Sequence, residues 1–254
     1  MLRALLRHDR AVTAGSLLVL ILLAWGWLFL GAGIEMEQMD MGGGEIMLMA
    51  PEWTARYAAL VFLMWVIMML AMMLPSTAPA ILLAGALMRQ RDGGHIIGPT
   101  GLFVLGYVTI WCGFSLAATG LQWGLDRAGL LSGDMASGSA TLAGVLLVAA
   151  GLYQWTPLKQ SCLVQCRSPY EHLLRYWRQG TMGPMLAGVR HGLFCLGCCW
   201  VLMGLLFVGG LMNVLWIGGL ALLVFIEKLL PRGPWVTRWA GVALVAWGAI
   251  VLIR

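Results

Sequence analysis

The sequence has very little charge: of its 254 residues only 11% are Asp, Glu, Lys or Arg. Soluble domains usually carry about 25% charged and roughly 45–50% apolar residues. Here 61% of the residues are hydrophobic and the mean hydropathy is +0.86. This excess is too large for one soluble core, and it also excludes a disordered chain. We therefore expect an all-α, polytopic transmembrane helical bundle.

Long polar segments are also scarce, so we expect a single integral membrane domain over residues 1–254. The two longest polar stretches are predicted to be an outer loop, 34–56, and a cytoplasmic loop, 159–190. The basic first residues and the apolar run after them resemble a secretory signal. That apolar run is too long for a signal and further spans follow it, so we interpret it as a retained anchor.

Seven segments are long and apolar enough to cross a membrane, for which a helix needs about 20 residues. The second contains Pro75 and Pro79, which predict a kink. The fifth and sixth are separated only by Gly209 and Gly210, which predicts a tight hairpin; a single long bent segment there would give six spans. The predicted spans cover residues 11–33, 57–88, 97–123, 139–158, 191–207, 211–230 and 236–253.

The basic residues predict the orientation, because cytoplasmic segments are rich in Lys and Arg. With the N-terminus inside and the C-terminus outside, all of the 16 Lys and Arg residues except Arg56, Arg127 and Arg254 fall on the cytoplasmic side. The net charge of +5 is then a topology signal near lipid and not a nucleic-acid-binding surface. We expect a multi-pass protein of a bacterial inner membrane, with membrane lipid as a partner and no nucleic acid.

The outer loop is rich in methionine and acidic residues. Thioether sulfur is a soft ligand suited to Cu(I), and carboxylates concentrate cations. A flexible acidic loop whose methionines dip into the interface is the alternative. The candidate ligands in this loop are Met36, Met39 and Met41.

A second group of methionines lies in the second predicted span. At about 100° per residue, Met64, Met68 and Met72 fall on one stripe of a helix, and Met69 and Met73 form a neighbouring row. Methionine also fills irregular gaps between helices well. The stripe is therefore either packing or the continuation of the outer metal-binding loop.

Five of the six cysteines fall in two clusters, which we expect in the inner, cytoplasmic third of the molecule. A helical wheel places one imidazole and three thiols of the second cluster on one face about 100° wide. Thiols at a reducing cytoplasmic interface stay free, so we expect a metal or redox role and no disulfide framework. Cys112, alone in the third span, is assigned to packing. The clusters are Cys162 and Cys166, and His191 with Cys195, Cys198 and Cys199.

The ligand chemistry leaves the metal open. Two or three thiolates suit Cu(I), whereas a four-ligand sulfur and nitrogen set suits Zn(II). Copper is the leading prediction, with zinc and iron as alternatives. Glu227, beside Lys228 near the end of the sixth span, is either an intramembrane functional group or a side chain that reaches water at the boundary.

Several stretches together resemble a known family. They are MMLAMMLPS at 68–76, YQWTPLKQSCLVQCRSP at 153–169, CLGCCWVLM at 195–203, and GLMN at 210–213 followed by Trp216, Glu227 and Lys228. The chain is similar in these to the predicted metal-binding integral membrane proteins, a bacterial family without an assigned function. The resemblance implies metal binding in a membrane protein. It names neither the metal nor a reaction.

Three hypotheses of function follow. The first is copper handling: Cu(I) is collected by the outer loop, passed along the methionines and received by Cys and His, for uptake, relay or delivery to a recipient metalloenzyme or from a metallochaperone. The second is a membrane-bound oxidoreductase dependent on a metal or on thiols, including haem held by His191 and a methionine. The third is a structural membrane subunit whose sulfur side chains only pack. We favour the first, and a role other than that of an enzyme.

Overall fold

The computed structural model describes residues 2–31, 37–40, 46–49, 52–92, 97–132, 135–168, 182–230 and 233–253. These residues are mostly helical, as predicted, and the two strands among them form a short antiparallel hairpin in the predicted outer loop. Its strands are β1 (Glu37–Asp40) and β2 (Ile46–Met49), which pair Met39 with Met47. The helices are α1 (Leu2–Phe29), α2 (Ala55–Asp92), α3 (Ile97–Arg127), α4 (Ala140–Tyr153), α5 (Pro157–Arg167), α7 (Met182–Gly204), α8 (Leu206–Gly209), α9 (Val214–Leu229) and α10 (Gly233–Ile253).

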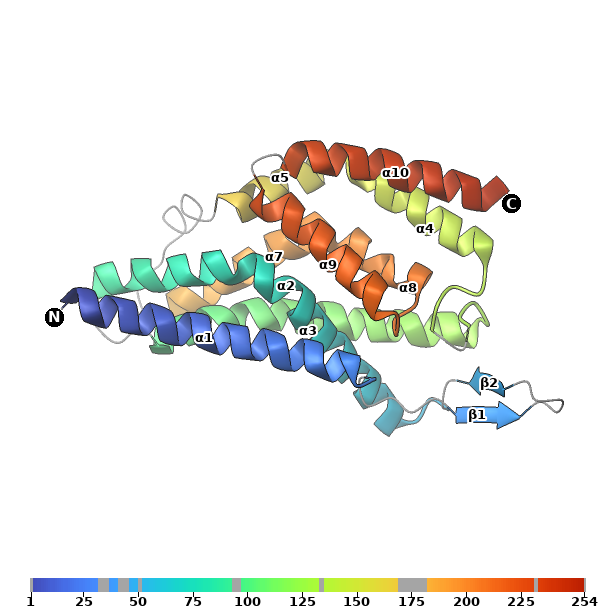
Figure 1. Cartoon of the computed structure of the whole chain (residues 1–254), viewed down its shortest axis with the longest axis horizontal. Coiled ribbons are helices and arrows are strands. Elements are labelled where there is room, and N and C mark those ends of the chain that lie inside the picture. The colour runs from blue at the N-terminus through green and yellow to red at the C-terminus, as the bar shows by residue number, and fades with distance from the viewer. Residues whose placement is uncertain are drawn as a thin grey trace.

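The helices run back and forth along one long axis (Figure 1). Helix α2 packs against α1, α3 and α9, while α3 also packs against α7. Helices α4 and α10 lie side by side, and α5 packs on α7. The first and last helices place the two chain termini at opposite ends of the long axis (Figure 1).

Glycines allow two of these helix pairs to approach closely. A Cβ at Gly188 of α7 would overlap the carbonyl oxygen of Phe103 in α3. A Cβ at Gly151 of α4 would lie 2.8 Å from the carbonyl oxygen of Gly241 in α10. Small residues at such crossings are typical of helix packing in membranes. The close approach of α7 to α3 brings the cysteine-bearing helix against the core.

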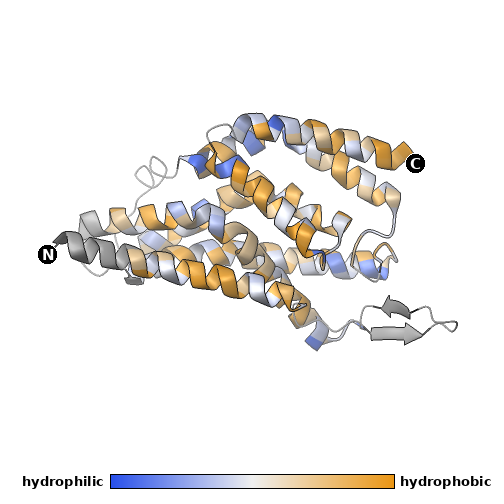
Figure 2. Ribbon diagram, viewed as in Figure 1, coloured by the Kyte–Doolittle hydropathy of each residue, from blue (hydrophilic) through white to orange (hydrophobic). Residues whose placement is uncertain are grey.

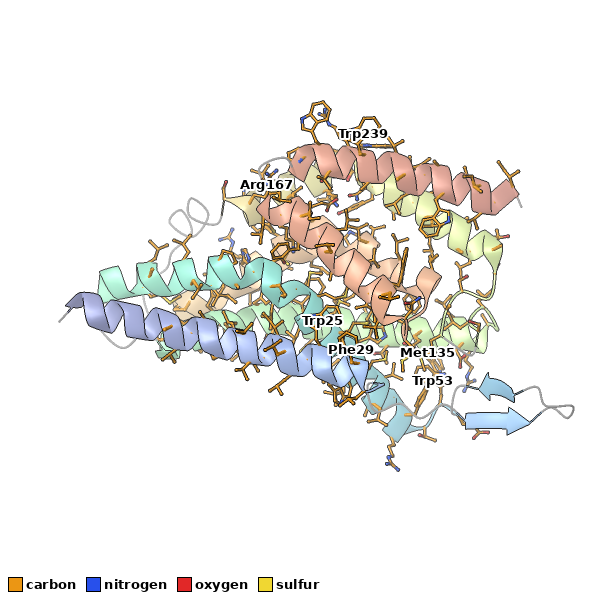
Figure 3. The ribbon with its side chains drawn as sticks, viewed as in Figure 1. Trp25, Phe29, Trp53, Met135, Arg167 and Trp239 are labelled. Carbon is orange, nitrogen blue, oxygen red and sulfur yellow. The ribbon has the colours of Figure 1, made fainter. Side chains whose placement is uncertain are left out.

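The two prolines of α2 lie inside one continuous helix, which changes direction about halfway along (Figure 1). Pro75 cannot donate a backbone hydrogen bond, which frees the carbonyl of Ala71. Trp25 of α1 donates its ring N–H to that carbonyl at 3.1 Å, and its side chain lies next to α2 (Figure 3). The neighbouring helix thus satisfies the carbonyl group that the proline leaves free.

The fourth predicted span is interrupted. Pro157 holds Thr156 in an extended conformation (φ −67°, ψ 145°), which ends the helical path. Helix α5 starts there with the Thr156 side chain as its N-cap, and the α4–α5 pair is bent by 64°. The predicted cytoplasmic loop 159–190 is therefore helical over α5 and over the first turns of α7, whereas residues 169–181 lie outside the described part of the chain.

The described residues contain five helical stretches that are long and apolar enough to cross a membrane, or up to six if the bent α4–α5 pair counts as one span. Helix α9, with 16 residues, is shorter than those stretches. It begins after a turn in which Gly210 has φ 89° and Asn213 caps the helix by accepting from the Trp216 N–H. The predicted hairpin is thus present between α8 and α9. The count of seven spans and the orientation stay predictions.

Candidate metal centre

The three cysteines of α7 are buried in the bundle, with exposed fractions of at most 1%. The sequence predicts them at or just inside the cytoplasmic interface, and this position relative to a membrane stays a prediction. Helix α7 begins at Met182, more than two turns before His191. The thiols of Cys198 and Cys199 donate to the carbonyl oxygen of Cys195 at 3.1 and 3.0 Å. The helix therefore gathers these sulfur atoms around one backbone turn inside the bundle.

The two cysteines of α5 face the same turn of α7. Cys162 is buried, and its Sγ would lie 2.7 Å from a Cβ placed on Gly197. The absence of a side chain at Gly197 therefore makes room for this sulfur. Cys166 is partly exposed, and its thiol lies close enough to the Cys198 thiol for the two to interact. The short helix that Pro157 starts thus brings the two predicted cysteine clusters together.

Helix α2 contributes a thioether to this group. Met73 is fully buried, and its Sδ lies 3.8 Å from the Cys199 Sγ. Metal–sulfur bonds of about 2.3 Å allow one ion to reach two sulfur atoms across such a distance. The stripe predicted as ligands, Met64, Met68 and Met72, is also buried. It is the neighbouring row, through Met73, that contacts a cysteine.

A lysine points into this cluster of sulfur side chains, called the sulfur group below, which consists of Cys162, Cys166, Cys195, Cys198, Cys199 and Met73. The ammonium of Lys228, on the last turn of α9, donates to the Cys195 Sγ at 3.0 Å. It also lies 3.4 Å from the Ser76 hydroxyl and 3.7 Å from the Met73 Sδ, and its residue is only 4% exposed. An ammonium has three donors and no acceptor. Its three acceptor neighbours therefore match the charged form, and a nearby cation stabilises a thiolate.

Tyr107 of α3 completes the surroundings of Cys195. The Tyr107 hydroxyl lies 3.1 Å from the Cys195 Sγ and accepts a hydrogen bond from Thr77 at 3.0 Å. Because Thr77 donates to it, the tyrosine has its own hydrogen free for the sulfur. Cys195 is thus placed to accept from both Lys228 and Tyr107, an arrangement that suits a thiolate.

His191, predicted as the nitrogen ligand, is 3% exposed and lies between two aromatic rings. Its ring centroid is 5.9 Å from that of Phe103 and 5.9 Å from that of Tyr107. The imidazole therefore packs on the face of α7 that meets α3, one turn before Cys195. Its metal-binding role stays a prediction.

A second buried charged group lies next to the sulfur group. Lys159, fully buried, donates to Glu227 at 2.7 Å. Gln154, in the turn between α4 and α5, donates to the other carboxylate oxygen at 3.0 Å. Glu227 is thus paired inside the protein. The interpretation that its side chain reaches water at the boundary is therefore wrong. The pair ties α9 to the start of α5.

The outer ligands are covered only in part. Met36 and Met41 lie outside the described residues, and the structure describes only the backbone of Met39, in β1. Among the residues that the structure describes, no three His, Cys, Asp or Glu side chains form a group that could hold a metal ion. One sulfur–sulfur contact joins the Cys199 thiol to the Met73 thioether.

Sequence reasoning does not predict the contacts of three residues at this site: Met73, Lys228 and Lys159. Lys159 and Lys228 each lie beside an apolar run, where a basic residue is usually interpreted as a topology signal. A usable signal was the pairing of Glu227 with Lys228 inside a predicted span, since an intramembrane charge normally has a partner. The identity of that partner depends on which helices meet.

The fold and the site together define a class: an apolar helical protein with a buried group of thiols and a thioether, the donor set that soft metal ions prefer. The copper chaperone family PpoB2 matches residues 62–251, three quarters of the chain, and the protein belongs to this family. The match covers α3 to α9 and most of α2 and α10, and therefore every residue of the sulfur group. No curated protein and no solved structure matches the chain.

Proposed function

We propose that this protein is a multi-pass membrane protein that binds Cu(I) as cargo between α2, α5 and α7 and hands it to a recipient protein. The observation that carries the proposal is the 3.8 Å contact of Met73 with Cys199, within a buried group of cysteines in a copper chaperone family member. Thiolate and thioether are the ligands that suit Cu(I).

The surface supports insertion in a membrane. Large apolar side chains are exposed along several helices, with exposed fractions of 89% for Leu215, 86% for Ile253 and 65% for Trp239. Trp239 points away from the bundle (Figure 3). Apolar residues dominate the outer helices α1 and α10, and hydrophilic ones gather near helix ends (Figure 2). A soluble monomer rarely exposes apolar surface on this scale.

The proposed route runs from outside to inside. Met36, Met39 and Met41 of the outer loop would collect the ion, and the methionines of α2 would lead toward Met73. The final ligands would be thiolates of α7 and α5. Thiolate is a stronger soft ligand than thioether, so the ion moves toward tighter binding as it passes inward. Delivery would then be the transfer from these thiolates to a recipient metalloenzyme.

The test is Cu(I) binding by the full chain in detergent, measured by competition with a chromogenic Cu(I) chelator. We expect sulfur ligation in the X-ray absorption spectrum and loss of the tight site when Cys195, Cys198 and Cys199 are replaced by Ser. The Cys162→Ser/Cys166→Ser variant shows separately whether the thiols of α5 contribute to Cu(I) binding. Cys112→Ser, at a partly exposed cysteine of α3, is the control and should bind as the wild type does.

An unchanged copper stoichiometry in the triple α7 variant would contradict the proposed site. Elemental analysis of protein purified without chelators distinguishes copper from zinc and iron. Tight zinc in place of copper would contradict the choice of metal while leaving the site in place.

A further inference from the structure

The sulfur group contains a positive charge that a cation-binding site would not be expected to have. Lys228 lies against the Cys195 Sγ, the Met73 Sδ and the Ser76 hydroxyl, at 3.0, 3.7 and 3.4 Å. These three acceptors occupy the three donors of an ammonium. A metal ion bound by Cys195 would therefore lie within a few ångströms of a fixed cation.

The buried charges can be counted within the described part of the chain. The buried Asp, Glu, Lys and Arg side chains there are Lys159, Glu227 and Lys228. Lys159 and Glu227 neutralise each other through their 2.7 Å ion pair. Lys228 leaves one positive charge, and the Cys195 Sγ, 3.0 Å from its ammonium, can balance that charge as a thiolate.

The same count distinguishes monovalent from divalent ions. Metal ligation takes sulfur as thiolate, and a second thiol of α7, Cys199 or Cys198, would supply a second negative charge. Two thiolates, one Cu(I) and Lys228 add up to zero. With Zn(II) or Cd(II) the same ligands leave an excess positive charge in the interior, which is costly to bury.

We propose that Lys228 is a built-in counter-ion that makes this site selective for monovalent soft cations held by two thiolates. The inference rests on the proposed function, because it concerns the same site. Lys228 acts through charge and does not bind the metal. The neighbouring Lys159–Glu227 pair fixes the end of α9, which positions Lys228.

The experiment compares metals of different charge on the full chain in detergent. Affinities for Cu(I), Ag(I), Cd(II) and Zn(II) are measured by competition for the wild type, Lys228→Gln, Lys228→Leu and Lys228→Arg. A unit charge a few ångströms from the ion changes a binding constant on the order of 100-fold at intermediate dielectric. Without Lys228 both thiols must release a proton when the ion binds, so Cu(I) or Ag(I) leaves a net negative charge in the interior, whereas Cd(II) or Zn(II) leaves none. We therefore expect the neutral variants to bind Cu(I) and Ag(I) more weakly and Cd(II) and Zn(II) more tightly.

The ratio of Cu(I) to Cd(II) affinity should fall at least about tenfold in both neutral variants and stay near the wild-type value in Lys228→Arg. Arg167→Gln is the matched control. It removes a positive charge at the end of α5, where Arg167 donates to the Leu230 carbonyl at 2.6 Å, beside the start of α10 (Figure 3). The ratio of Cu(I) to Cd(II) affinity should not change in Arg167→Gln.

Elution as a single peak in size-exclusion chromatography identifies the variants that have folded, and two neutral replacements are used so that one misfolded variant does not end the test. If the wild type binds Cu(I) but a folded neutral variant has an unchanged ratio of Cu(I) to Cd(II) affinity, this inference is overturned and the proposed function stands. A wild type that binds no Cu(I) would overturn the proposed function and the inference with it.

Discussion

Met73 differs from the other buried methionines of α2 in its neighbours, a thiol at 3.8 Å and an ammonium at 3.7 Å. We expect Met73→Leu to weaken Cu(I) binding by on the order of tenfold, about 1.4 kcal/mol, because one soft ligand is lost without changing the packing volume much. Chelator competition measures the change. Met88→Leu is the control, since Met88 is also buried on the same helix and lies beyond Met73 on the proposed route. Equal weakening in both variants would contradict a special role for Met73.

The Lys159–Glu227 ion pair should matter most for stability. Both residues are at most 1% exposed, so removing one partner leaves a buried charge unpaired. We expect Glu227→Gln or Lys159→Met alone to lower the free energy of unfolding by about 3–5 kcal/mol. Unfolding by a denaturing detergent, followed by tryptophan fluorescence, reports the change. The double variant Lys159→Met/Glu227→Gln should be more stable than the less stable of the two single variants, and additive losses would show that the residues do not act as a pair.

For individual residues, the sequence indicates which side chains could bind a metal but not which of them contact one another. The spacing of Cys195, Cys198 and Cys199 predicts one helical face, and the structure places them around one buried turn. The approach of Met73 depends on the rotation of α2 against α7. A helical wheel carries no information on which row of methionines faces which neighbour, so Met64, Met68 and Met72 were selected as the stripe.

Helix packing depends on small residues at a few positions. Any side chain at Gly188 would overlap the backbone of α3, whereas a Cβ at Gly120 meets no atom within 4 Å in the described structure. We expect Gly188→Ala to destabilise the protein by about 1–3 kcal/mol because the helices must separate. Gly120→Ala should instead be neutral or stabilise by up to about 1 kcal/mol, through the higher helix propensity of alanine. Unfolding in denaturing detergent compares the two, and a loss at Gly120 as large as at Gly188 would be inconsistent with the packing argument.

The boundaries of the elements show what the sequence can and cannot predict. Helix makes up most of each of the seven predicted spans, because long apolar runs are a strong signal, but the fourth is divided between α4 and α5 and the fifth between α7 and α8. The break at Thr156 and the short α5 differ from the prediction, because the apolar run 139–158 continues past Pro157, which marks the break. Helix α7 starts at Met182, earlier than predicted, because the basic residue Arg190 is interpreted as the end of the cytoplasmic loop and His191 as the start of the span. In the structure the small residues around them let α7 continue along α3.

For the whole molecule, the direction of the helices bears on the number of spans. Successive long segments alternate in direction, and the termini lie at opposite ends (Figure 1). An even number of crossings would bring both termini to one side of a membrane. The bent α4–α5 pair decides whether the number of crossings is odd or even, because it either crosses the membrane or turns back within it. If it crosses, α9 and α10 continue to an outer C-terminus and the buried lysines lie nearer the cytoplasmic side.

Topology reporters in a bacterial host test this arrangement. Alkaline phosphatase, active only outside the cytoplasm, is fused after Gly31, after Ser168 and after Arg254, with green fluorescent protein at the same positions as the inverse reporter. Because Lys and Arg are retained on the inner side, we expect phosphatase activity after Gly31 and Arg254 and fluorescence after Ser168. Phosphatase activity after Ser168 together with fluorescence after Arg254 would mean that α4 and α5 turn back within the membrane. The cysteines of α5 would then approach α7 from the outer side, and the proposed inward route of the metal would need to be reversed at that step.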